Sequence, residues 1–228
     1  MPGECAGVTV RGVSEPAYIR ATRAAYDVVA VDYAALLRTE LAEKPFDRAM
    51  LGAFAEHVRA SGDRPVADLG CGPGRVTAHL HALGMTTFGV DLSTAMVAEA
   101  RRAYPDLRFD EGSIAELNIA DRSLGGVVAW YSLIHTPPNL LPAVFAEFHR
   151  VLAPEGYLLA AFQVGDACVH LEQAYGHAVS LDVYRLSPDV ICELLGECGF
   201  DVRVRCVREP DAPETLRQAY VLARKRAA

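Results

Sequence analysis

Apolar and polar positions follow two different rhythms along the middle of the chain. Short apolar runs bounded by turn residues predict strands at 65–69, 86–91, 107–110, 126–131 and 156–163. Between them, apolar residues at helical spacing predict helices that open near Pro73 and that cover 94–103 and 139–152. Strands that alternate with helices pair in parallel, because each helix crosses over the sheet before the next strand begins. The pattern therefore predicts an α/β domain built on a mostly parallel sheet.

The C-terminal part of the chain is expected to close this sheet. Ser187 is a predicted N-cap, Pro188 suits the first helical position, and Gly199 is expected to end that helix. Apolar runs then follow at 201–207 and 218–223, with a polar connection and no helical pattern between them. This arrangement predicts an antiparallel hairpin at the end of the sheet.

Two further regions are expected to lie around the core. Residues from about 14 to 60 have helical periodicity, and Pro45 is expected to separate two helices of this N-terminal cap. The stretch 165–186 mixes polar and aromatic residues and is longer than the usual connection in a compact domain, so we expect a lid-like insertion over a site. The 228 residues are expected to form a single domain, with the core over 64–225.

Composition and charge narrow the range of functions. The 22 Lys and Arg residues stand against 29 Asp and Glu residues, and the net charge of −7 disfavours a nucleic-acid partner. No signal sequence and no long apolar stretch is recognised, so we expect a cytoplasmic protein without a membrane partner. The six cysteines form no C-x-x-C pair, and no metal site is predicted.

A glycine-rich run, Asp-Leu-Gly-Cys-Gly-Pro-Gly, begins at Asp68 between a predicted buried strand and a predicted helix. Its glycines, Gly70, Gly72 and Gly74, allow a tight turn and let a ligand approach the backbone at the carboxyl edge of the sheet. Turns of this kind serve several cofactors. A dinucleotide fingerprint needs its third glycine at the position of Arg75, so the pattern argues against nicotinamide binding.

The ends of the next strands carry further candidate ligand contacts. Asp91 lies 21 residues after Gly70, where a carboxylate can accept hydrogen bonds from ribose hydroxyls. Nicotinamide enzymes use a carboxylate in the same way, so Asp91 alone does not discriminate. Met96 lies one helical turn further on, and its thioether suits the face of an aromatic ring.

Together these segments resemble the motifs of class I S-adenosylmethionine-dependent methyltransferases of the bacterial small-molecule type, over about 64–225. The resemblance implies a Rossmann-like, seven-stranded sheet and a glycine turn that accommodates the methionine part of S-adenosylmethionine. It also implies that Asp68 helps to hold the ammonium group of the cofactor, directly or through water, and that Met96 packs on the adenine. Other cofactor contacts that it implies are Leu92, Ser113, Ile114, Trp130 and Tyr131. Many relatives carry Asp where this chain has Ser113.

His135 and Tyr26 are the predicted catalytic residues. His135 follows the fourth strand at the edge where acceptors dock, and a neutral imidazole can take a proton near pH 7. A histidine that only shapes the pocket is an equally open interpretation. Tyr26 and Tyr33 share one face of the first helix, where they could cover the cofactor and touch the acceptor; core packing is the alternative for both.

The acceptor is expected to bind near the lid-like insertion. Predicted acceptor contacts, each with packing or surface exposure as the alternative, are Tyr33, Gln163, His170, Tyr175 and His177. Their polar aromatic character favours an aromatic intermediate of secondary metabolism, methylated on oxygen, nitrogen or carbon by in-line displacement. A non-catalytic S-adenosylmethionine-binding protein and, less favoured, a nicotinamide-dependent oxidoreductase are the alternatives.

Overall fold

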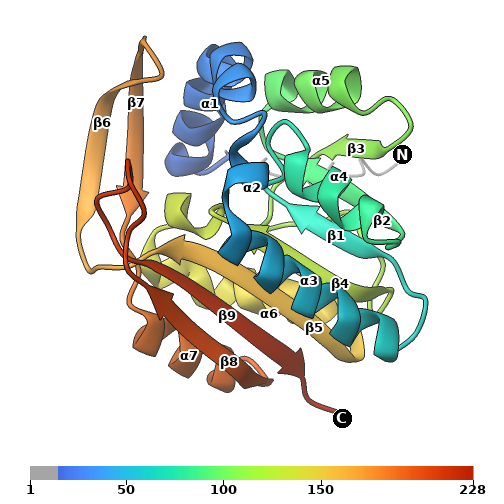
Figure 1. Ribbon diagram of the computed structural model, residues 1–228. Helices are drawn as coiled ribbons and strands as arrows, with labels where there is room; N and C mark the ends of the chain where they lie inside the picture. Colours follow the sequence, from blue (N-terminus) through green and yellow to red (C-terminus); the bar gives the residue numbers. More distant parts are fainter. Residues whose placement is uncertain (1–14, 228) are drawn as a thin grey trace, which may run out of the picture.

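The computed structural model describes residues 15–227, whose centre is one mixed sheet of seven strands (Figure 1). The strand order is β3-β2-β1-β4-β5-β9-β8. The strands are β1 (Val66–Leu69), β2 (Thr87–Asp91), β3 (Arg108–Glu111), β4 (Leu124–Trp130), β5 (Leu152–Gln163), β8 (Phe200–Arg208) and β9 (Gln218–Lys225). The first five pair in parallel, and β9 lies antiparallel between β5 and β8. The Rossmann-like sheet and its closing hairpin are therefore confirmed.

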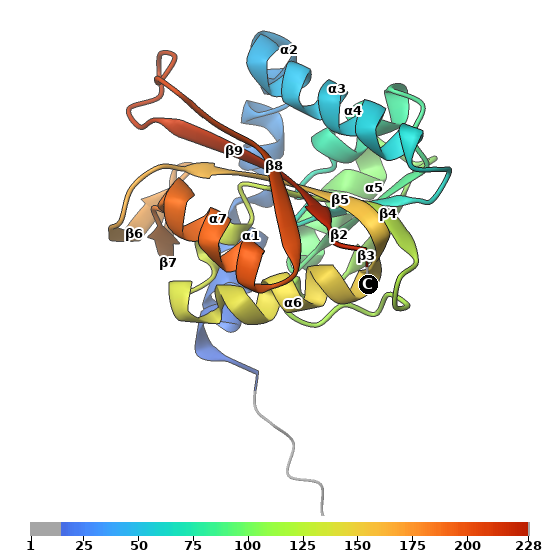
Figure 2. The ribbon, with the colours of Figure 1, turned by 90° about the horizontal axis from the view of Figure 1, so that it is seen from below.

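Helices cover both faces of this sheet (Figure 2). α3 (Pro45–Ala60) and α4 (Arg75–Ala82) lie on one face, and α6 (Leu141–Val151) and α7 (Pro188–Glu197) on the other. All seven residues of β4 are buried, and they alternate between the two cores: Val127 and Ala129 face the α6 side, while Val128 and Trp130 face the α3 side. A strand buried on both faces must be apolar throughout, as this one is.

Local signals set most of the element ends where the sequence predicts them. The Ser93 hydroxyl accepts a hydrogen bond from the Met96 amide at 3.1 Å and caps α5 (Thr94–Ala103). Ser187 caps α7 with Pro188 at the first position, and Gly199 follows that helix at φ +88°. One strand differs, because β5 begins at Leu152 and not at 156: Leu152 already pairs with Leu124 of β4.

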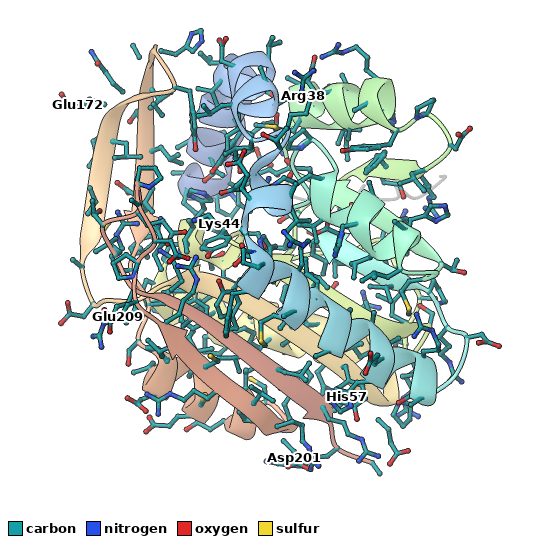
Figure 3. All side chains as sticks on the ribbon, viewed as in Figure 1. Arg38, Lys44, His57, Glu172, Asp201 and Glu209 are labelled. Carbon is teal, nitrogen blue, oxygen red and sulfur yellow. The ribbon has the colours of Figure 1, made fainter. Side chains whose placement is uncertain are left out.

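The N-terminal cap consists of α1 (Ala17–Leu36), the short α2 (Glu40–Glu43) and α3, which begins at Pro45. α1 lies away from the other two and packs against α5 (Figure 1). Lys44, labelled in Figure 3, precedes α3 and forms an ion pair with Glu214 of the β8–β9 connection at 2.6 Å. The cap is thus attached to both ends of the core. In the described part of the chain, no helix has the length and apolar character needed to cross a bilayer.

The stretch 165–186, for which the sequence predicts a lid-like insertion, has regular secondary structure. It contains β6 (Cys168–Ala174) and β7 (His177–Tyr184), an antiparallel hairpin that stands apart from the main sheet, with β7 packed along α1 (Figure 1). The hairpin turns at Tyr175 and Gly176, which both have positive φ, as a tight two-residue turn requires. Every second residue of β7 faces inward, so the hairpin packs against the rest of the domain through one face.

Candidate active site

An open cavity lies at the carboxyl edge of β1, β2 and β4, beneath α1. The predicted cofactor residues that line it are Gly70, Gly72, Asp91, Leu92, Met96, Ser113, Ile114, Trp130 and Tyr131. Further lining residues that the sequence did not single out are Tyr18, Ile19, Thr22, Ser93, Ser132 and Thr136. Three of these belong to α1. The position of α1 over the sheet depends on contacts with residues far away in the sequence, so no local sequence pattern predicts it.

The glycines of the turn after β1 serve different purposes. All adopt positive φ, at +79° for Gly70, +53° for Gly72 and +84° for Gly74. A Cβ on Gly72 would face open space, with Tyr33 the nearest neighbour at 3.8 Å. A Cβ on Gly74 would lie 2.7 Å from the Phe109 ring, and Gly74 does not line the cavity. Gly72 therefore leaves room for a ligand, whereas Gly74 allows α4 to begin close to β3.

Asp91 lies at the end of β2 with both carboxylate oxygens held by the backbone. Oδ2 accepts from the Gly72 amide at 2.7 Å, and Oδ1 accepts from the Ser93 amide at 2.9 Å. Burial raises the pKa of Asp91 to about 6, although these amides favour the charged form. At neutral pH a carboxylate with further acceptor capacity thus faces the cavity, which suits the hydroxyls of a ribose.

Asp68 lies fully buried beneath the glycine turn and does not line the cavity itself. Its Oδ2 accepts from the Thr77 hydroxyl at 2.7 Å, while its Oδ1 is buried without a partner among the described residues. Burial raises the pKa of Asp68 to about 6. The Ser132 hydroxyl, which lines the cavity, is likewise buried without a partner.

These features fit S-adenosylmethionine. The unpartnered oxygen of Asp68 is an acceptor to which an ammonium group can donate, directly or through water. The space beside Gly72 leaves room for a ligand. Met96 is almost fully buried where it lines the cavity, and Ile114 and Trp130 line the cavity too. Apolar surface of this kind suits the faces of an adenine ring.

The predicted catalytic residues are in contact. The Tyr26 hydroxyl and His135 Nε2 lie 2.7 Å apart, and His135 Nδ1 lies 3.3 Å from the backbone carbonyl oxygen of Asp182. A carbonyl only accepts, so Nδ1 carries the proton and Nε2 accepts from the Tyr26 hydroxyl. Burial lowers the pKa of His135 to about 4, which keeps the imidazole neutral at neutral pH.

A second open cavity lies between α1 and the β6–β7 hairpin. Tyr26 and His135 line both cavities and form the boundary between them. Two predicted acceptor residues, Gln163 and Tyr175, line the second cavity. Apart from the shared pair and Arg185, the rest of the lining is aliphatic: Ala25, Val29, Ile134, Leu171, Ala174, Val179, Leu181 and Val183.

The other predicted acceptor residues lie elsewhere. Tyr33 lines the first cavity, on the cofactor side, and packs edge-on against Tyr26 and Tyr175. His170 and His177 line neither cavity: His170 pairs with Asp182 at 2.7 Å on the outer face of the hairpin, and His177 pairs with Asp32 of α1 at 2.6 Å. Their positions therefore give no support to a role in acceptor binding.

The chain is similar in sequence to known methyltransferases. The family model for a methyltransferase domain matches residues 66–156. A demethylmenaquinone methyltransferase from Beutenbergia cavernae is 38% identical over 105 residues, which are 45% of this chain and 43% of that protein. A trans-aconitate 2-methyltransferase from Escherichia coli is 41% identical over 97 residues, 41% of this chain and 36% of that protein. The chain thus spans less than half the length of these relatives.

Solved structures extend the likeness to the whole fold. A magnesium protoporphyrin IX methyltransferase from Synechocystis with bound S-adenosylmethionine covers 93% of this chain and 99% of its own, with a TM-score of 0.69 and 16% identity. A Burkholderia thailandensis 1,6-didemethyltoxoflavin methyltransferase with bound S-adenosylhomocysteine covers 86% of this chain and 90% of its own, with a TM-score of 0.59 and 22% identity. Residues 66–156 therefore match the model of a methyltransferase domain, and the chain shares its fold with solved S-adenosylmethionine-dependent methyltransferases.

Proposed function

We propose that this protein transfers the methyl group of S-adenosylmethionine to a small molecule held in the second cavity. The observation that carries the proposal is the Tyr26–His135 pair, which lines both cavities and so stands where a donor and an acceptor would meet. The relatives support a small acceptor, since their names include demethylmenaquinone and trans-aconitate methyltransferases.

The residues around the first cavity would bind and orient the cofactor. Asp91 would accept hydrogen bonds from the ribose hydroxyls, and the free oxygen of Asp68 would accept from the ammonium group. Bound S-adenosylmethionine supplies an activated methyl group on a sulfonium, so the main task of the protein is alignment and exclusion of water. α1 contributes to both, because its residues Tyr18, Ile19 and Thr22 cover the cavity.

Tyr26 and His135 would manage the proton that the acceptor loses. When an acceptor O–H, N–H or C–H group is methylated, its proton can pass to the Tyr26 oxygen as the Tyr26 proton passes to His135 Nε2. The Asp182 carbonyl keeps the Nδ1 proton in place and orients the ring. A histidine with a pKa of about 4 is a weak base, so the proton must leave to solvent or be accepted late, after positive charge has developed on the acceptor.

The experiment that tests this function measures S-adenosylhomocysteine release with a panel of phenols, indoles, amines and carboxylic acids, together with calorimetric binding of the cofactor. Release with one acceptor class is the expected result. Cofactor binding without release from any acceptor would favour the alternative of a non-catalytic binding protein. Absence of cofactor binding would contradict the assignment of Asp68 and Asp91.

A further inference from the structure

The inner face of β7 determines the character of the second cavity. Val179, Leu181 and Val183 line it, whereas the residues between them point outward. This is the two-residue period of a strand with one buried face. The next inward position along the same line is Arg185, so a guanidinium ends an otherwise aliphatic row.

Arg185 is the one lining residue of this cavity with a formal charge at neutral pH. The other titratable groups in the lining are His135, Tyr26 and Tyr175: burial lowers the pKa of His135 and raises the pKa of both tyrosines, so all three are neutral. Among residues 15–227, no carboxylate forms an ion pair with Arg185. Burial also lowers the pKa of Arg185, which shows that the charge is partly removed from water. A partly desolvated, unpaired guanidinium is costly unless an anion joins it.

The backbone holds Arg185 in this position. Its amide donates to the Ala167 carbonyl at 2.8 Å, and the neighbouring Leu186 amide donates to the Gln163 carbonyl at 3.0 Å. A Cβ on Gly165 would lie 2.6 Å from the Arg185 Cβ, so the absence of a side chain at Gly165 is what admits Arg185 here. The backbone segments that follow β5 and β7 therefore fix the position of Arg185.

Gln163 adds a second polar group beside the arginine. Val164 and Leu186 pair in parallel, so the residues that precede them, Gln163 and Arg185, lie side by side on the same face. Both line the second cavity, and Gln163 Oε1 is buried without a partner among the described residues. The unused atom is an amide oxygen, which only accepts, so the two groups match a ligand that offers an oxyanion to Arg185 and a nearby hydrogen-bond donor to Gln163 Oε1.

We propose that the methyl acceptor has an apolar body and a carboxylate, and that Arg185 binds this carboxylate with Gln163 beside it. The inference rests on the proposed function, because it names the substrate class of the same enzyme. The aliphatic row of β7 would enclose the body, and the nucleophilic atom would lie at the Tyr26–His135 end. Arg185 is then a specificity determinant that takes no part in the proton transfer.

Two fluorescent probes with the same aromatic body test the charge preference. One is 8-anilinonaphthalene-1-sulfonate, an oxyanion, and the other is N-phenyl-1-naphthylamine, which lacks the sulfonate. Titrations use the full chain with saturating S-adenosylhomocysteine, which occupies the first cavity, and are repeated without it. We expect Arg185→Gln to weaken binding of the anionic probe about tenfold and to leave binding of the neutral probe unchanged.

Two variants serve as controls. Arg203→Gln removes the same charge from an exposed position on β8 that lines neither cavity, and it should leave both probes unaffected. Val179→Trp fills the second cavity and should weaken both probes, which shows where they bind. Circular dichroism and thermal unfolding confirm that each variant is folded.

The outcomes separate cleanly. Equal binding of the two probes to the unaltered protein, equal losses in Arg185→Gln and Arg203→Gln, or binding that Val179→Trp does not weaken would each overturn the proposal. Failure of S-adenosylhomocysteine to bind would instead contradict the proposed function, and the titrations without it would still report on Arg185.

Discussion

The Tyr26 hydroxyl lies 2.7 Å from His135 Nε2, although 109 positions separate the two residues along the chain. Tyr26 comes from the middle of α1 and His135 from the short η1 helix (Leu133–His135) after β4. Their rings meet edge to face, with centroids 5.1 Å apart. The N-terminal cap therefore contributes directly to the proposed catalytic centre, and docking of α1 is required to assemble it.

Removing either member of this pair should slow methyl transfer without preventing cofactor binding. We expect His135→Gln and Tyr26→Phe to lower kcat by about 100-fold, the usual size of a general acid–base contribution. Single-turnover formation of S-adenosylhomocysteine measures the chemical step, and calorimetry measures the cofactor Kd. Unchanged turnover in both variants would leave the pair a purely structural role at the boundary.

Cofactor affinity should fall as the pH is lowered through about 6. Burial raises the pKa of Asp91 to about 6, and the ionised carboxylate is the form that accepts from ribose, so protonation removes the acceptor. Asp68 has the same direction of shift and the same cause. Between about pH 7.5 and 5 we expect Kd for S-adenosylhomocysteine to rise roughly tenfold.

Asp91→Asn is the matched variant for this pH effect. It keeps the size of the side chain and removes the titration, so its affinity should already be low at neutral pH and should depend less on pH. A steep pH dependence that persists unchanged in Asp91→Asn would assign the effect to another group, with Asp68 the first candidate.

The turn glycines should separate ligand binding from stability. Gly72→Ala places a methyl group in the space left for a ligand and costs about 1 kcal/mol at φ +53°. Gly74→Ala must also displace the buried Phe109 ring, which raises the expected loss of unfolding free energy to about 3 kcal/mol. Urea unfolding and calorimetry measure the two effects. Equal stability losses, or intact cofactor binding in Gly72→Ala, would contradict this division.

Asp27 should act as a positioning residue for Tyr26. Its Oδ1 accepts from the Ser93 hydroxyl at 2.6 Å and from the Ala95 amide at 3.1 Å, which fastens α1 to the start of α5. Asp27→Ala should lower kcat about tenfold through displacement of Tyr26, whereas Asp32→Ala, on the same helix, removes only a surface hydrogen bond with His177. Addition of Tyr26→Phe to Asp27→Ala should cause little further loss, because both changes act on one hydroxyl. Fully additive losses would place Asp27 on a separate path.

Many residues that the sequence selects for the cofactor line the first cavity, and this agreement depends on local chemistry. The turn at Gly70 and Gly72 needs glycine, a carboxylate must end β2, and the cap at Ser93 lies within a few residues of the helix it starts. These requirements leave a signature in adjacent positions. The strands and helices around them follow from the same short-range patterns.

The second cavity is less predictable, because residues that are far apart in the sequence come together to form it. In β7 the apolar residues Val179, Leu181 and Val183 alternate with polar ones, whereas the sequence predicts a lid-like insertion over 165–186 from its length and its mixed polar and aromatic residues. His170 and His177 were selected for their residue type, yet both form surface hydrogen bonds with aspartates. Arg185 was missed because its place in the second cavity appears only when Leu186, which follows β7, pairs with Val164, which follows β5.

The bond that orients His135 comes from the main chain of Asp182, and this has an evolutionary consequence. Any residue at position 182 has the same backbone carbonyl. Substitutions along β7 can therefore change the shape of the second cavity without altering the tautomer of His135. Side chains of β7 line the second cavity, whereas a backbone carbonyl of the same strand orients His135. A descendant or a designed variant can therefore adopt a new acceptor through changes at positions 179, 181, 183 and 185 while it keeps the old reaction centre.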